Sequence, residues 1–190
     1  MKIITGSKKG KRLISLEGDA TRPTSERIKE AIFSSIQFDI EGRRVLDLFA
    51  GSGQMGLEAL SRGAASAMFV DASLDAMKVV KANITATDFT SCSRTLVSDY
   101  RNYIRKAARG GEVRFDLVFI DPPYALACAK DALARLDDGG LLADGALCVL
   151  EVGEEALEFS GEEFSRFEVQ KLTHYGKKSA VCILLYHKGA

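Results

Sequence analysis

The chain has 190 residues, of which 46% are hydrophobic and 27% charged, enough for one globular domain with a substantial core. No run of about 18 apolar residues occurs and residues 1–6 contain no hydrophobic signal segment, which excludes the usual membrane-span pattern and predicts a cytoplasmic location. The four cysteines form no Cys-x-x-Cys pair and only two histidines are present, so we expect no metal site.

The net charge is zero, but the charges are unevenly distributed. Residues 1–30 contain eight Lys or Arg and four acids, which gives this segment a net charge of +4. A basic segment on a neutral chain indicates an anionic partner. Charge alone is equally compatible with a solvated basic surface.

The first 40 residues predict a small extension that precedes the main domain. Two short β-like runs, at 2–5 and 11–16, flank a Gly- and Lys-containing turn at 6–10, which predicts a hairpin. Thr24 or Ser25 can cap a helix that continues to about residue 37. We therefore expect an extension over residues 1–40 and one domain over residues 41–190.

From residue 41 onward, strands and helices alternate. Strands are expected at 45–49, 67–71, 95–98, 115–120 and 146–151, and helices at 54–62, 73–86, 100–108 and 126–136. This alternation predicts an α/β fold, a mostly parallel sheet with helices on both faces. Two further strands, at 164–173 and 179–187, predict an antiparallel hairpin at one edge.

A glycine-rich loop follows the first strand of the main domain. Gly51, Gly53 and Gly56 match the pattern G-x-G-x-x-G. Asp71 follows at the end of the next strand, where a carboxylate can bind a ribose diol. The pattern by itself is typical of a nicotinamide dinucleotide site.

Two details distinguish this loop from a dinucleotide site. Asp47 stands before the glycines, where it would repel a pyrophosphate but could attract a cation, and Phe49 and Ala50 widen the turn. A cofactor with an adenosine, an ammonium and a sulfonium suits the loop better than a diphosphate. Asp99 ends the third strand and can accept a hydrogen bond from an adenine amino group.

The segment Asp121-Pro122-Pro123-Tyr124 directly follows the apolar strand at 115–120. Two consecutive prolines end the strand in a fixed, extended turn. In an open α/β sheet, ligands bind at this end of the strands. Asp121 and the Pro122 carbonyl can each accept one N–H of the exocyclic amine of a nucleobase, and Tyr124 can stack on the base.

These motifs resemble the class I S-adenosylmethionine-dependent methyltransferases, and residues 121–124 resemble the motif of the branch that methylates adenine N6, cytosine N4 or guanine N2. Residues 6–13, 21–27, 47–56 and 63–64 extend the resemblance, over nearly the whole chain, to the bacterial 16S rRNA (guanine-966-N2)-methyltransferase family. Lys177 and Lys178 depart from it, because we expect an acidic and a small polar residue in that turn.

The resemblance implies a Rossmann-like, seven-stranded sheet of strand order 3-2-1-4-5-7-6. It also implies S-adenosylmethionine as the cofactor and a guanine of 16S rRNA, presented on the 30S subunit, as the target. We expect a monomer that binds neither a metal nor a membrane.

The resemblance also implies a role for each candidate residue. The cofactor-binding residues would be Asp47, Phe49, Gly51, Gly53, Asp71 and Asp99, with Thr21, Arg22 and Thr24 closing over the cofactor. The catalytic residues would be Asp121, Pro122 and Tyr124, and the RNA-binding residues Lys8, Lys9, Lys11 and Arg12.

Three alternatives remain open on sequence. An N6-adenine methyltransferase shares the double-proline motif, although 190 residues leave little room for a DNA target-recognition domain. A nicotinamide-dependent oxidoreductase would have no use for residues 121–124. A ribosome-assembly protein with a relict cofactor site would bind without turnover. A cytosine-C5 enzyme is disfavoured because no cysteine adjoins residues 121–124.

Overall fold

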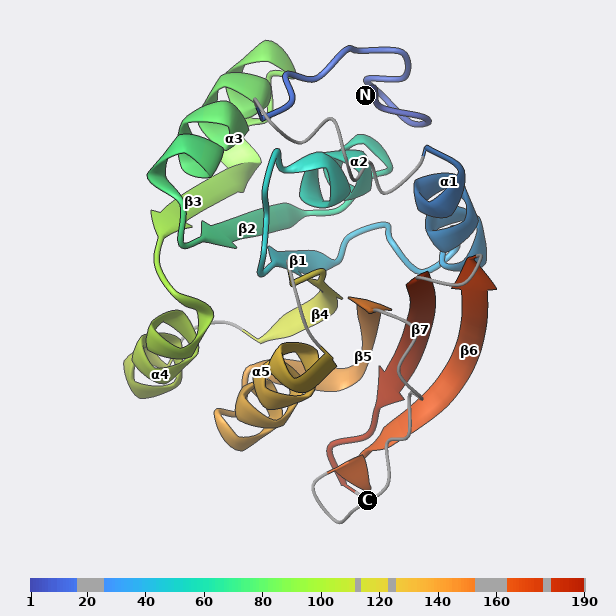
Figure 1. Cartoon of the computed structure of the whole chain (residues 1–190), viewed down its shortest axis with the longest axis vertical. Coiled ribbons are helices and arrows are strands. Elements are labelled where there is room, and N and C mark those ends of the chain that lie inside the picture. The colour runs from blue at the N-terminus through green and yellow to red at the C-terminus, as the bar shows by residue number, and fades with distance from the viewer. Residues whose placement is uncertain (17–25, 112–113, 123–125, 153–163, 176–178, 190) are drawn as a thin grey trace. The chain divides into compact units, whose positions relative to one another are not determined.

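In the computed structural model the chain forms two compact units, Met1–Asp99 and Tyr100–Ala190. The structure describes residues 1–16, 26–111, 114–122, 126–152, 164–175 and 179–189 (Figure 1). The extension expected over residues 1–40 lies within the first unit.

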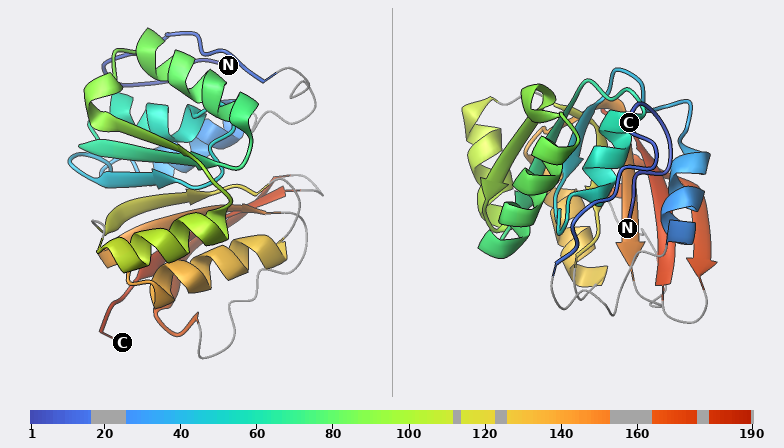
Figure 2. Two further views of the ribbon diagram at one scale, coloured as in Figure 1. Left: turned by 90° about the vertical axis from the view of Figure 1, so that its left-hand side faces the viewer. Right: turned by 90° about the horizontal axis from the view of Figure 1, so that it is seen from above.

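The first unit is built on three parallel strands in the order β3-β2-β1. The strands are β1 (Arg44–Asp47), β2 (Ser66–Asp71) and β3 (Ser93–Val97), and the helices are α1 (Glu26–Ser35), α2 (Gln54–Ser61), α3 (Leu74–Ala86) and the short 3₁₀ helix η2 (Thr90–Cys92). Helices α2 and α3 cover the same face of these strands (Figures 1 and 2), as successive right-handed crossovers require.

The second unit contains four strands in the order β4-β5-β7-β6. They are β4 (Phe115–Ile120), β5 (Leu142–Val152), β6 (Phe167–Tyr175) and β7 (Ser179–Tyr186), and helices α4 (Tyr100–Gly110) and α5 (Leu126–Asp138) lie side by side on one face (Figure 2). Strands β4 and β5 are parallel, whereas β7 is antiparallel to both β5 and β6. The strand orders 3-2-1 and 4-5-7-6 of the two units together make up the expected order 3-2-1-4-5-7-6. The predicted α/β fold with an antiparallel C-terminal hairpin is therefore confirmed.

Several element boundaries differ from the sequence-based prediction; β6, for example, begins at Phe167 rather than at 164. Strand β5 begins at Leu142 rather than at 146, because the pairing shifts at a bulge and Asp144 and Gly145 interrupt the apolar run. The N-terminal hairpin pairs through a single antiparallel bridge, Lys2 with Arg12, instead of two full strands.

The N-terminal segment is bound to α2 through a carboxylate that is fully removed from solvent. Glu58 accepts hydrogen bonds from the backbone N–H groups of Ile4 at 2.7 Å and Thr5 at 3.0 Å. Arg62 Nε donates to the same carboxylate at 2.9 Å. A buried carboxylate needs such partners, because an unpaired buried charge is strongly unfavourable.

A buried lysine of α1 completes this cluster. Lys29 Nζ lies 3.5 Å from Glu58 Oε2 and donates to the Lys2 carbonyl oxygen at 2.6 Å. Burial lowers the pKa of Lys29, although the neighbouring Glu58 carboxylate opposes this shift. The cluster therefore joins α1, α2 and the N-terminal segment through paired charges.

Replacing Glu58 with Gln should destabilise the protein by about 3 kcal/mol, because Lys29 would then be buried without a counter-charge. Urea unfolding followed by circular dichroism would measure the change. The matched control is Glu26→Gln, since Glu26 is half exposed and lies 4.0 Å from Lys2. The Glu26→Gln substitution should lower the free energy of unfolding by less than about 1 kcal/mol. Equal losses for the two variants would contradict the importance of the buried cluster.

Candidate active site

The loop between β1 and α2 turns through two glycines in the left-handed region. Gly51 has a φ of 53° and Gly53 a φ of 79°, conformations that side-chain-bearing residues adopt at a cost. The Gly53 N–H donates to the Ala50 carbonyl oxygen at 2.6 Å and closes the turn. The predicted glycine loop is therefore present at the start of α2, with Gly51 partly exposed and Gly53 buried.

The third glycine of the motif has a packing role. A Cβ atom on Gly56 would lie 2.4 Å from Cε1 of Phe69, in strand β2. Helix α2 thus approaches the sheet more closely than any side chain at this position would allow. This contact explains why the motif needs a glycine here.

Asp71, at the carboxyl end of β2, binds the glycine loop directly. Its Oδ2 accepts the Gly51 N–H at 2.9 Å, and its Oδ1 accepts the Ser73 N–H at 2.8 Å. Each carboxylate oxygen can accept more than one hydrogen bond, so both can still receive a hydroxyl. The geometry fits a ribose diol bound at the end of β2.

Asp47, at the end of β1, lies beneath the same loop. Its side chain is buried, with 3% of the residue surface exposed, and its Oδ2 accepts the Gly56 N–H at 3.0 Å. Burial raises the pKa of Asp47 to about 7, and the charge of Asp71 adds to this shift while the Gly56 hydrogen bond opposes it. Asp47 therefore binds the first turn of α2, in addition to any contact with a ligand.

The end of β3 provides the third predicted acid, together with apolar neighbours that sequence analysis missed. Asp99 is exposed two residues beyond β3. Val97 is 41% exposed and Leu74, the first residue of α3, is 60% exposed. Exposed apolar side chains at the end of β3 and the start of α3 could contact the faces of an adenine. Their positions close to Asp99 and Asp71 in the sequence were the available signal.

In the second unit, the strand that precedes the double-proline motif ends where predicted. Strand β4 ends at Ile120, and Asp121 and Pro122 follow it directly. Asp121 is half-buried and Pro122 is buried. Tyr124 of this motif lies outside the described residues, as do Thr21, Arg22 and Thr24 of the predicted cofactor-covering segment and the turn that contains Lys177 and Lys178.

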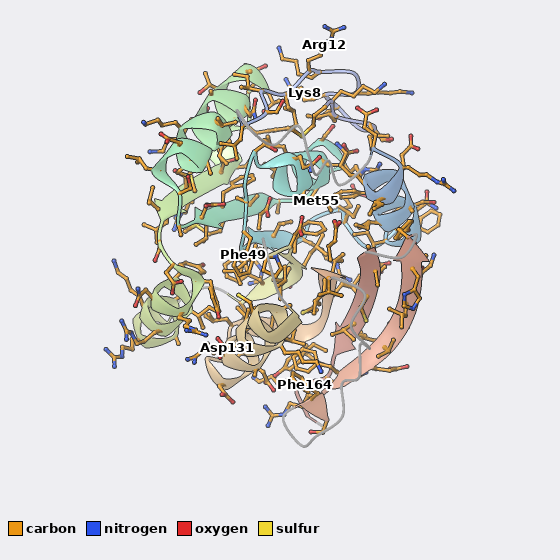
Figure 3. The ribbon with its side chains drawn as sticks, in the orientation of Figure 1. Lys8, Arg12, Phe49, Met55, Asp131 and Phe164 are labelled. Atoms are coloured by element: carbon orange, nitrogen blue, oxygen red, sulfur yellow. The ribbon has the colours of Figure 1, made fainter. Side chains whose placement is uncertain are left out.

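The four predicted RNA-binding cations fall into two groups. Lys8 Nζ is 2.9 Å from Asp88 Oδ2 and 5.9 Å from the ring centroid of Phe89, so its charge is paired within the first unit. Lys9, Lys11 and Arg12 are exposed, and Figure 3 shows Arg12 projecting away from the fold. The structure therefore separates Lys8, which anchors the hairpin, from three cations that face solvent.

One buried amide connects the hairpin to the glycine loop. Asn83, in α3, accepts the Ile14 N–H at 2.8 Å and donates to the Ile14 carbonyl oxygen at 2.9 Å. Its amide nitrogen also donates to the carbonyl oxygen of Ser52 at 2.9 Å. A conformational change in the glycine loop would consequently affect the anchor of residue 14.

The residues that the structure describes contain no group of three or more His, Cys, Asp or Glu side chains arranged to bind a metal. Within the same part of the chain, no helix is both long and apolar enough to cross a membrane. Phe49, which is labelled in Figure 3, lies on the loop after β1. Its side chain is half-buried.

Comparison with known sequences matches residues 1–184 to the family model described as conserved hypothetical protein 95. The Bacillus subtilis (strain 168) protein YlbH is 39% identical over 155 residues, which cover 82% of this chain and 84% of YlbH. Ribosomal RNA small subunit methyltransferase D of Escherichia coli (strain K12) is 33% identical over 151 residues, which cover 80% of this chain and 74% of that protein.

Comparison with solved structures shows the same fold along the whole chain. The Escherichia coli protein yhhF superimposes with a TM-score of 0.86 and 28% identity, covering 99% of this chain and 98% of that one. A more distant structure, SMU.776 complexed with SAH, has a TM-score of 0.64 and 16% identity, and covers 83% of this chain and 49% of that one. At that identity, the likeness to SMU.776 shows the fold alone.

The raised pKa of Asp47 predicts a pH-dependent stability. In the unfolded chain this carboxyl has its ordinary pKa near 3.8, so the folded protein binds its proton more tightly between about pH 4 and pH 7. The contribution of Asp47 to stability should be complete below pH 4 and be lost as the pH rises through 7, by on the order of 4 kcal/mol.

Asp47→Asn keeps an acceptor for the Gly56 N–H and should remove this dependence. Denaturant unfolding of the cofactor-free protein at several pH values would compare the variant with the wild type. The control is Asp138→Asn, since Asp138 is exposed at the end of α5. If the Asp47→Asn and wild-type curves stay parallel from pH 4 to pH 8, the buried carboxyl does not titrate in this range.

Proposed function

The chain belongs to the conserved hypothetical protein 95 family, the family of the small-subunit rRNA methyltransferases D, and we propose that it methylates the N2 amine of one guanine of 16S rRNA. The guanine corresponds to position 966, and the methyl donor is S-adenosylmethionine. The substrate is the rRNA in the 30S particle, and the enzyme acts in the cytoplasm as a monomer.

The observation that carries this proposal is the position of Asp121 and Pro122 directly after β4, in a chain of this family. Asp121 and the Pro122 carbonyl are acceptors, and an exocyclic amine offers two N–H donors. Accepting both would orient the N2 lone pair away from these residues and toward the methyl carbon. The guanine would be turned out of its RNA context and stacked on Tyr124.

The first unit supplies groups that fit S-adenosylmethionine. The Asp71 oxygens can accept the ribose hydroxyls, Asp99 can accept from the adenine amino group, and Leu74 and Val97 can contact the adenine faces. The loop with Gly51, Gly53 and Phe49 would hold the methionine portion, with the buried Asp47 contributing negative potential beneath it. Thr21, Arg22 and Thr24 would cover the bound cofactor.

When bound, S-adenosylmethionine supplies a methyl carbon that is electrophilic because it is attached to a positively charged sulfur. The protein's part is positional: alignment of amine, methyl carbon and sulfur accounts for most of the rate enhancement. No strong base is required, because the amine becomes very acidic once it is methylated. The Asp121 carboxylate stabilises the positive charge that develops on N2.

Asp121→Ala should abolish methyl transfer, while the affinity for S-adenosylmethionine stays within about twofold of the wild-type value, because the cofactor groups are carried by other strands. Transfer from labelled S-adenosylmethionine to 30S subunits that lack the modification, with nucleoside analysis, measures the activity. Asp138→Ala, which removes an exposed acid of α5, is the control and should remain fully active.

The product identifies the substrate in the same experiment. N2-methylguanosine from the wild-type protein is the expected product, whereas N6-methyladenosine would replace the guanine assignment with adenine. Near-normal turnover by Asp121→Ala would overturn the catalytic assignment. Cofactor binding without any product would favour a binding protein of ribosome assembly.

Neutralising Lys9, Lys11 and Arg12 with Gln should weaken RNA binding and reduce the slope of log K against log salt by about 2 to 3, because each lost phosphate contact removes roughly one. Lys8→Gln should change the slope much less, because Lys8 is already paired with Asp88. Filter binding to a 16S rRNA fragment at several salt concentrations tests both. Equal slopes for the triple variant and the wild type would show that Lys9, Lys11 and Arg12 do not contact RNA phosphates.

A further inference from the structure

Helix α4 concentrates positive charge on one exposed face. Of its eleven residues, Arg101, Arg105, Lys106 and Arg109 are basic and exposed, and none is acidic. The opposite face packs into the second unit through buried side chains, namely Tyr100, Tyr103, Ile104 and Ala107. In a chain with no net charge, four cations on one helix face make a local excess of positive potential.

Most of this charge is not neutralised within the fold. Among the described residues, Lys106 and Arg109 have no carboxylate within 4.0 Å. Arg105 donates to the neutral amide oxygen of Asn102 at 2.7 Å, and in the part of the chain that the structure describes it forms no ion pair. A solvated basic helix usually pairs such cations with acids three or four residues away, and α4 contains no such acid.

The helix is also fixed in position, through Asp131 of α5. This carboxylate accepts hydrogen bonds from Tyr100 Oη at 2.7 Å, from Arg101 Nε at 3.0 Å and from Arg135 Nε at 2.8 Å, and Figure 3 shows Asp131 between α4 and α5. The hydrogen bond from Arg135 and those from Tyr100 and Arg101 hold the pKa of Asp131 well below its usual range. These hydrogen bonds join the first turn of α4 to α5 and so hold the helix that carries the cations.

The spacing of the arginines suits a linear series of anions. Arg105 and Arg109 are four residues apart and share one stripe, so they are about 6 Å apart along the helix axis, whereas Arg101, one turn earlier, is paired with Asp131. This spacing is comparable with that of successive phosphates in an RNA strand. The planar guanidinium group matches the geometry of phosphate oxygens.

Other partners fit this face less well. None of the exposed large hydrophobic residues of the described chain lies on α4. A membrane surface or a stable protein partner would need apolar anchors between the charges. A face of cations without large apolar side chains is typical of a surface that binds a nucleic-acid backbone.

We propose that the exposed face of α4 is a second phosphate-binding surface for the RNA substrate, separate from the N-terminal hairpin and carried by the second unit. This inference rests on the proposed function, because it takes the substrate to be rRNA. Contacts to phosphates fix the register of the RNA and read no bases, so α4 contributes to substrate affinity and leaves the chemistry unchanged.

The test replaces Arg105, Lys106 and Arg109 together with Gln in the full-length protein. The KM for 30S subunits should rise roughly tenfold with kcat unchanged, and the salt slope of rRNA binding should fall by about 2 to 3. The affinity for S-adenosylmethionine and the unfolding temperature should stay at the wild-type values, because all three side chains are exposed.

Two control variants separate position from total charge. Lys81, Arg94 and Lys188 are exposed cations outside α4, and replacing these three with Gln should leave the KM within about twofold of wild type. Arg105→Lys with Arg109→Lys keeps the charge and should preserve the salt slope, which a loss of helix packing would not do.

The outcomes distinguish this inference from the proposed function. One outcome is that the wild-type protein methylates 30S subunits while the α4 variant has the same KM and salt slope as the control at Lys81, Arg94 and Lys188. That result would overturn the α4 surface and leave the proposed function intact. A wild-type protein that neither methylates nor binds rRNA would overturn both. A selective rise in KM for the α4 variant would establish the surface.

Discussion

The packing of the hairpin, α1 and α2 in the first unit depends on one buried carboxylate, that of Glu58. Glu58 has no exposed surface and is paired with Lys29 of α1, with Arg62 just after α2 and with two backbone N–H groups of the N-terminal segment. A charge in such a position is stable only when every partner is present, so the hairpin, α1 and α2 must assemble as one arrangement. The same arrangement fixes the end of α2 that lies opposite the glycine loop.

A second pair of carboxylates gives the glycine loop its shape. Asp71 binds the N–H of Gly51, and Asp47 binds the N–H of Gly56, so acids at the ends of adjacent strands hold the two sides of the loop. Their environments differ: Asp47 is buried with a pKa of about 7, whereas Asp71 is partly exposed. One acid is therefore suited to positioning the loop and the other to meeting a ligand.

The sequence predicted the order of elements well, because hydrophobic periodicity and the acids that end strands are local signals. It missed contacts whose partners are far apart. Lys8 resembles its basic neighbours in sequence, and only folding brings it to Asp88, 80 residues away. Glu58 and Asn83 carried a weaker signal, because each is one of several polar residues of its helix and the sequence does not mark it as buried. The early start of β5 was hidden by Asp144 and Gly145, because a bulge breaks the alternation.

The anchors of the N-terminal segment also constrain the order in which the protein folds. Ile4 and Ile14 precede their partners Glu58 and Asn83 by 54 and 69 residues, so they are synthesised before them. The segment can only dock once α2 and α3 have formed, since long-range contacts follow local ones in folding. During synthesis, the basic hairpin therefore stays undocked until α2 and α3 have left the ribosome, and the hydrogen bonds to Glu58 and Asn83 form only then.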